Sequence, residues 1–211
     1  MAFRKILLII LGGIGLIIVS VMLASLIYPS VRGIDDMSAG QTFTLPLAIP
    51  PLLEPRNESG EKVFDLVARR GNTQFRPGVE TTTAGFNGAY LGPTIRAHRG
   101  DRVRMNVTNS LDEPTTVHWH GMHLPAAMDG GPHQIIDAGS TWQPHWTISN
   151  EASTLWYHPH FMGRTGPQVY SGLAGLFIID DANSDALALP RTYGVDDIPV
   201  VVQDRKFDAL G

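Results

Sequence analysis

From Lys62 onward, short strand-like runs alternate with clusters of turn residues, and this alternation constrains the fold more than any other feature of the sequence. The 22 glycines and 15 prolines supply the turns. After residue 30 only Ala182–Leu189 has even a weak helical period. The expected strands are Val63–Ala68, Thr94–Ala97, Val103–Thr108, Thr115–Trp119, Trp142–Ile148, Thr154–His158, Leu173–Ile179 and Ile198–Gln203. About eight strands without a long helix predict an all-β, Greek-key β-sandwich.

The sequence divides into three expected parts. Residues 1–30 form a signal anchor or signal peptide, residues 31–55 a Pro-rich linker with an entry strand, and residues 56–211 the sandwich domain. The middle part is expected to be extended because Pro46, Pro50, Pro51 and Pro55 exclude a helix. Residues 69–88 are expected to form a loop, since several glycines and a proline interrupt them.

The first part is almost wholly apolar from Ile6 to Ile27 and follows the basic pair Arg4 and Lys5. As a helix rising about 1.5 Å per residue, this segment would cross the hydrocarbon core of a membrane. Met22 and Leu23 stand where a cleaved signal peptide needs a small residue, which favours an uncleaved anchor. The preceding positive charges then predict that the domain lies on the extracytoplasmic face of the cell membrane. The alternative is a secreted or periplasmic domain after cleavage.

The chain contains no cysteine, and its formal net charge is −4. The missing thiol excludes a disulfide framework, a zinc–cysteine site, a catalytic thiol and an iron–sulfur cluster within this sequence. It also excludes a blue-copper (type 1) centre, which needs a cysteine thiolate beside two histidines. The charge gives no reason to expect nucleic acid as a partner.

Two His-X-His pairs, His118/His120 and His158/His160, are the strongest functional signal. On a strand, residues i and i+2 point to the same face, so each pair directs two imidazoles one way. Pro159 cannot donate to a strand ladder, which predicts that the second pair lies at a strand end or edge. Four converging imidazoles would suit copper, zinc, iron or nickel, and the residue types alone do not choose among these metals.

The other histidines are expected to have surface or hydrogen-bonding roles rather than to bind metal. They are His98, His123, His133 and His145. The four tryptophans, Trp119, Trp142, Trp146 and Trp156, are expected in the sandwich core or in the walls of the site.

The two pairs lie within an ordered series of motifs: Tyr90-Leu91-Gly92-Pro93-Thr94-Ile95-Arg96; His118-Trp119-His120-Gly121-Met122-His123-Leu124-Pro125; Met128-Asp129-Gly130-Gly131-Pro132; Thr154-Leu155-Trp156-Tyr157-His158-Pro159-His160; Gly172-Leu173-Ala174-Gly175-Leu176; and Asp196-Asp197-Ile198-Pro199-Val200. These motifs resemble those of the multicopper oxidases, in particular their bacterial laccase and cuprous-oxidase branch. The resemblance runs from about residue 45 to residue 211. One departure is Phe161-Met162-Gly163, where members of the family often have a further histidine.

The resemblance implies a cupredoxin-like (plastocyanin-like) domain that gives four histidines to a trinuclear copper cluster. By position, His118 corresponds to a type 2 copper ligand, His120 and His158 to ligands of one type 3 copper, and His160 to a ligand of the other. Asp129 corresponds to an acidic residue that relays protons, although Asp-Gly-Gly-Pro is also a strong turn signal. The implied activity is oxidation of a reducing substrate with reduction of O2 to water.

Four imidazoles are half the ligand set of such a cluster, and the type 1 copper site is absent from the chain. We therefore expect an N-terminal portion of a multicopper oxidase, inactive alone and completed by C-terminal cupredoxin domains in cis or in trans. The alternatives are a membrane-tethered copper-binding module without turnover and a cupredoxin scaffold that has lost its copper chemistry. Retention of all four histidines disfavours the scaffold.

Overall fold

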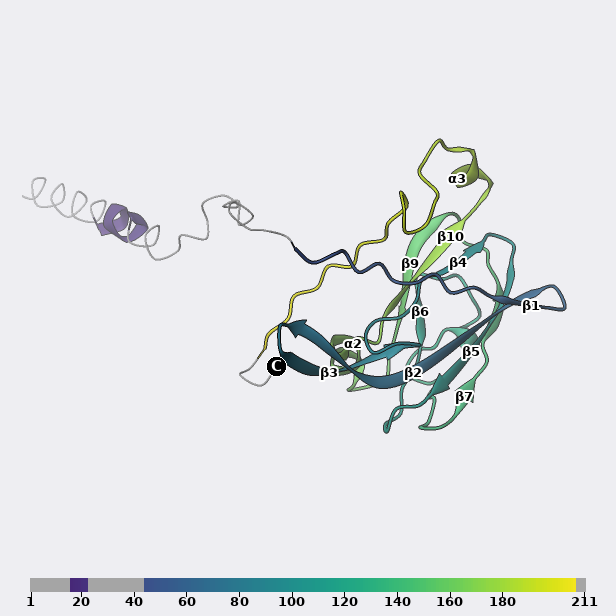
Figure 1. The fold of residues 1–211 in the computed structure, drawn as a ribbon, viewed down its shortest axis with the longest axis horizontal. Coiled ribbons are helices and arrows are strands. Elements are labelled where there is room, and N and C mark those ends of the chain that lie inside the picture. Colours follow the sequence, from purple (N-terminus) through teal and green to yellow (C-terminus); the bar gives the residue numbers. More distant parts are fainter. Residues whose placement is uncertain (1–15, 23–43, 208–211) are drawn as a thin grey trace, which may run out of the picture. The chain divides into compact units, whose positions relative to one another are not determined.

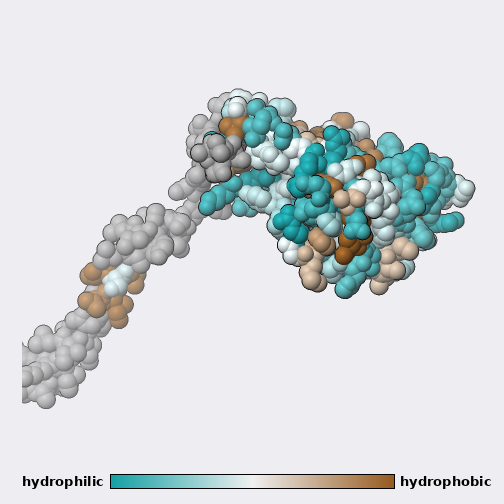
Figure 2. Space-filling model, turned by 90° about the horizontal axis from the view of Figure 1, so that it is seen from below, coloured by the Kyte–Doolittle hydropathy of each residue, from teal (hydrophilic) through white to brown (hydrophobic). Residues whose placement is uncertain are grey.

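The structure is a computed structural model that describes residues 16–22 and 44–207. Residues 16–22 are helical and expose large apolar side chains, shown in brown in Figure 2. They are a small part of the predicted membrane segment, and the rest of that segment lies outside the described residues. In the two described ranges no helix is both long enough and apolar enough to span a bilayer.

The chain splits into two compact units, Met1–Leu47 and Ala48–Gly211, and the second contains every named strand. Its strands form two mixed sheets (Figure 1). The larger sheet contains β1 (Arg56–Glu58), β2 (Glu61–Arg76), β3 (Val79–Phe86), β5 (Arg102–Asn109), β7 (Thr141–Trp142) and β8 (His145–Thr147). The smaller sheet has the order β4 (Ile95–His98), β10 (Gly175–Asp180), β9 (Ser153–His158) and β6 (His118–His120). The predicted all-β sandwich is confirmed.

The core lies between the two sheets because each strand buries alternate residues. In β5, for example, Val103, Met105 and Val107 are fully buried while the residues between them are partly exposed. The smaller sheet contributes large side chains, among them Trp119 and Tyr157, whose rings lie 5.8 Å apart. Figure 2 shows hydrophilic side chains over most of the visible face of this unit, as period-two strands with one buried face require.

Two predictions of secondary structure were wrong, one of a loop and one of a strand. Residues 69–88 do not form a loop, because β2 continues to Arg76 and pairs with β3 as a long antiparallel hairpin. Gly71 is part of this strand, where an added Cβ would lie 2.7 Å from the Cβ of Ala89, so the glycine allows a close approach. Ile198–Gln203 is not a strand and runs as an irregular segment.

Short helices lie outside the sheets. The weak helical pattern at Ala182–Leu189 corresponds to α3 (Ala182–Ala186), which begins with a capping box formed by Asp181 and Ser184. A single 3-10 turn, η2, spans Ala126–Met128. Helix α2 (Thr165–Ser171) follows the second His-X-His pair and was not expected from the sequence.

Candidate metal centre

The two His-X-His pairs lie on neighbouring antiparallel strands. The register of β6 and β9 places His118 opposite His158 and His120 opposite Trp156. The intervening Trp119 and Tyr157 point the other way, into the core, and are 1% and 0% exposed. His118, His120 and His158 therefore present their imidazoles on the face away from the core, as the period-two argument predicts.

Three of the four imidazoles form a compact group. Nitrogen atoms of His118, His120 and His158 all lie within 4.8 Å of one another. The shortest approach joins Nδ1 of His120 to Nε2 of His158, at 3.2 Å. Two ring nitrogens at this distance need a proton or a cation between them, since two facing lone pairs repel. The group therefore fits either an N–H···N hydrogen bond or a shared metal ion.

The surroundings of His158 leave one of its nitrogens free to bind a metal. Its Nδ1 lies 2.8 Å from the carbonyl oxygen of Pro159, which accepts the proton of the neutral ring. The lone pair is then on Nε2, the atom that faces His120. Burial lowers the pKa of His158 to about 4, and the other three imidazoles act in the same direction. This ring is therefore neutral at pH 7, as a metal ligand must be.

His160 is placed differently from the other three. Strand β9 ends at His158, as Pro159 predicts, and His160 follows outside the ladder. Its ring centre lies 5.4 Å from that of His118 and 6.3 Å from that of His158. His160 is not part of the three-histidine group. It is therefore better placed to bind a second ion beside that group than to share the ion bound by the group. Its backbone N–H donates to Oγ1 of Thr116 at 2.7 Å.

Asp129 lies against His118 through two oxygens. Nδ1 of His118 is 3.0 Å from the backbone carbonyl oxygen of Asp129 and 3.3 Å from its carboxylate Oδ2. The same carbonyl accepts the N–H of Trp119 at 3.3 Å. A proton on Nδ1 leaves Nε2 of His118 available to a metal. The carboxylate is 38% exposed, so it reaches both solvent and the imidazole.

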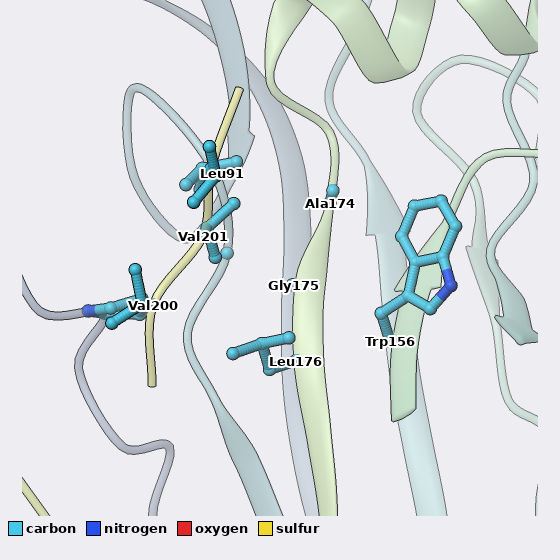
Figure 3. Close-up of a pocket in the computed structure, with 10 residues that line it drawn as sticks. Leu91, Trp156, Ala174, Gly175, Leu176, Val200 and Val201 are labelled. Atoms are coloured by element: carbon cyan, nitrogen blue, oxygen red, sulfur yellow. The ribbon is translucent and has the colours of Figure 1, made fainter. Parts of the chain in front are cut away.

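Trp156 forms a wall of the site. Its indole stacks on the ring of His158, with centroids 3.9 Å apart and planes 23° apart, and lies 5.2 Å from His120. Trp156 also lines an apolar cavity of about 270 Å³, together with Leu91, Leu176 and residues 200–202 (Figure 3). A second, more open cavity of about 430 Å³ is lined by Trp156, His158 and residues of α2.

The remaining histidines do not belong to the three-histidine group. His98 is half exposed and lies 3.6 Å from a carboxylate oxygen of Asp185. His145 is an exposed residue of β8. No ligand group of three His, Asp or Glu side chains includes any of these among the described residues.

Two buried residues that support the site, Thr116 and Gln168, were not predicted from the sequence, whereas Trp156 lies in the wall of the site, one of the two places expected for the tryptophans. Thr116 and Gln168 are buried polar side chains, 0% and 2% exposed. No local pattern marks them, because their partners lie about 40 to 50 residues away along the chain. The alternation of Trp156 with His158 along β9 places the indole on the same face as the histidine.

Several known proteins are similar to this chain. The family model described as multicopper oxidase matches residues 67–184. Multicopper oxidase mco of Staphylococcus aureus is 41% identical over 162 residues, which are 76% of this chain and 36% of that protein. Cell division protein FtsP of Escherichia coli (strain K12) is 41% identical over 174 residues, or 82% of this chain and 36% of that protein.

Solved structures show the same similarity. The laccase-like multicopper oxidase CueO of Ochrobactrum sp. is 47% identical with a TM-score of 0.68, over 73% of this chain and 34% of that one. A laccase from Pediococcus acidilactici is 39% identical with a TM-score of 0.76, over 80% and 37%. The chain thus spans about a third of the length of these relatives.

Proposed function

The chain belongs to the multicopper oxidase family, and we propose that its sandwich domain supplies half of the histidine ligands of a trinuclear copper cluster that reduces O2 to water. The observation that carries this proposal is the 3.2 Å approach of His120 Nδ1 to His158 Nε2. These two ring nitrogens lie beside a third imidazole, that of His118, and the ligand atoms of all three are within 4.8 Å of one another. All-imidazole sites of this kind suit copper.

We assign the four ligands separate roles. His118 would bind the type 2 copper, His120 and His158 one type 3 copper, and His160 the other type 3 copper. His160 is not part of the three-histidine group and its ring centre lies 6.3 Å from that of His158, which suits a ligand of the other type 3 copper, whereas the separate role of His118 rests on its position in the motif. Copper bound there would pass electrons to dioxygen, whose reduction to two water molecules consumes four electrons and four protons.

Asp129 is the proposed proton relay. Its carboxylate is partly exposed and lies 3.3 Å from Nδ1 of His118, so it can take a proton from solvent and hold it beside the site. Its backbone carbonyl meanwhile orients His118. The carbonyl oxygen of Asp129 would therefore position His118, and its carboxylate would supply protons to the site.

The rest of the activity needs groups that this sequence does not contain. A type 1 copper requires a cysteine, and the sequence has none. Cupredoxin domains in cis or in trans would supply that copper, the other cluster ligands and the site for the reducing substrate. We propose that this chain alone does not turn over. Export, with an N-terminal membrane anchor, is part of the same proposal and rests on the apolar residues 6–27.

Copper(II) titration of the full chain, followed by equilibrium dialysis and electron paramagnetic resonance, tests the ligand assignment. We expect binding at micromolar copper without intense blue absorption, since no thiolate is present. Changing His118, His120, His158 and His160 to Ala together should abolish that binding. A matched control changes His98, His133 and His145 to Ala and should retain it. Copper retention by the first variant would refute the proposal.

A second candidate is a membrane-tethered copper-binding module without turnover. The observations that favour it are the three-histidine group, which could bind copper, and the absence of any cysteine for a type 1 copper in the sequence, while relatives of equal identity include one whose name, Cell division protein FtsP, states no oxidase activity. Oxygen uptake by the copper-loaded product of the whole gene, with a phenol, an amine or Cu(I) as reductant, separates the two. Copper binding without oxygen uptake would support the module.

A further inference from the structure

The strand pair that carries the four histidines is very short. β6 contains three residues, and only three residue pairs join it to β9. Beyond His118 and His158 the backbone ladder cannot continue, because the next residue of the second strand is Pro159, which has no N–H. His160 therefore needs another contact to hold it beside His118.

That contact comes from a side chain in the same register. His118 pairs with His158, so the antiparallel register would place Thr116 opposite His160. At this position the N–H of His160 donates to Thr116 Oγ1 at 2.7 Å. The hydroxyl oxygen of Thr116 accepts this hydrogen bond in place of a backbone carbonyl. It thus links the two chain segments at His160, the first residue after Pro159.

A buried polar cluster between the segment 114–116 and α2 holds Thr116 in place. The adjacent Thr115 donates its hydroxyl to Oε1 of Gln168 at 2.9 Å. Nε2 of Gln168, in α2, donates to the carbonyl oxygen of Pro114 at 2.9 Å. Thr115 and Thr116 are 0% exposed, and Gln168 is 2% exposed. These groups have no water to replace a lost partner, so their hydrogen bonds specify one geometry.

We propose that Thr116 is a positioning residue for copper: its hydroxyl holds His160 in register with His118 past Pro159, so that the two His-X-His pairs face one metal centre. This inference rests on the proposed function. Gln168 supports it by fixing the chain segment that ends in Thr116 against α2. Removing a hydrogen-bond partner that orients a metal ligand costs about 10- to 100-fold in metal affinity.

The test compares copper(II) binding by the full chain and three variants. Thr116→Val keeps the side-chain shape but removes the acceptor, and we expect its dissociation constant to rise about tenfold. Thr116→Ser keeps the hydroxyl and should restore wild-type affinity. The matched control is Thr83→Val, at a buried threonine of β3 whose hydroxyl donates to the carbonyl oxygen of Ala89 at 2.7 Å. It loses a buried hydrogen bond but should bind copper normally.

Two further measurements separate this inference from the function on which it rests. Amide hydrogen exchange at His160, measured without metal, should be faster in Thr116→Val than in the wild type. In Thr116→Ser it should be as slow as in the wild type. In a His160→Ala background, Thr116→Val should have no further effect on copper affinity. Wild-type affinity in Thr116→Val, or an equal loss in Thr83→Val, would overturn the inference while leaving the ligand assignment intact. Failure of His160→Ala to weaken binding would overturn both.

Discussion

Nδ1 of His118 lies 3.0 Å from the backbone carbonyl oxygen of Asp129, so a main-chain oxygen, closer than the Asp129 carboxylate at 3.3 Å, orients the first imidazole of the site. The carbonyl is held there because Gly130, next in the chain, adopts a φ of +73°. An added Cβ at Gly130 would lie 1.7 Å from the carbonyl oxygen of Val117. The loop can therefore press against β6 only with a glycine at this position.

The first prediction follows from that close approach. Gly130→Ala should displace the loop, weaken copper binding at His118 by tenfold or more, and lower the free energy of unfolding, as copper titration and urea denaturation would measure. Gly139→Ala is the matched control, because Gly139 has a φ of +79° with no atom within 4 Å of the added Cβ. It carries similar backbone strain without the clash and should bind copper normally. Equal copper affinities in the two variants would contradict the prediction.

The second prediction concerns the protonation of His158. Its pKa falls from an ordinary value near 6.5 to about 4 in the folded protein, chiefly through burial. Between these two pH values the unfolded chain binds a proton that the folded chain does not, so the metal-free protein should lose stability as pH falls from about 6.5 to 4. Nuclear magnetic resonance of the imidazole nitrogens should show a midpoint near 4. His158→Gln should remove this part of the pH dependence, and an unchanged dependence would argue against it.

The sandwich and the histidine faces could be predicted from the sequence because both depend on period two within single strands. The hairpin of β2 and β3 could not, because Gly71 and Gly85 look like turn residues but lie inside paired strands. Gly85 lies against residues 88–91 just after it, and Gly71 lies against Ala89, a contact between distant positions that sequence alone does not reveal. Helix α2 was missed since its Gly166-Pro167 resembles a turn, and Gln168 holds it by contacts with residues over 50 positions away.

The candidate site shows the same division between local and long-range information. That His118 and His120 share a face follows from the strand period. That His120 faces His158, and that Thr116 supports His160, depends on the register between two strands about 40 residues apart. Pro159 predicts where β9 ends. Nothing near it in the sequence identifies the Thr116 hydroxyl, which accepts the hydrogen bond of the His160 N–H beyond the end of the strand.

The third prediction tests the packing beneath the site, where Tyr157 fills the space between two glycines. An added Cβ at Gly175 would lie 2.2 Å from Cζ of Tyr157, and one at Gly92 would lie 2.4 Å from its hydroxyl oxygen. The hydroxyl also donates to the carbonyl oxygen of Pro93 at 2.7 Å, so the ring cannot move away freely. Gly175→Ala should therefore destabilise the fold by about 1–3 kcal/mol in urea denaturation. Gly166→Ala, in α2 with open space around it, should instead stabilise by about 0.5 kcal/mol.

The fourth prediction concerns acid stability and rests on Arg96 of β4. This side chain donates to both carboxylate oxygens of Asp180 in β10, at 2.6 and 2.9 Å, and to Asp197 at 2.6 Å. The Arg96 hydrogen bonds lower the pKa of Asp180, so the carboxylate stabilises the fold above its unfolded pKa, near 4, and loses that contribution as pH falls through its lower folded value. Asp180→Asn should cost about 2 kcal/mol at pH 7 and much less at pH 2 in urea denaturation. Asp112→Asn, which removes an exposed partner of Arg70, should change stability little at either pH. An equal loss at both pH values would show that the contact between β4 and β10 depends on shape rather than on charge.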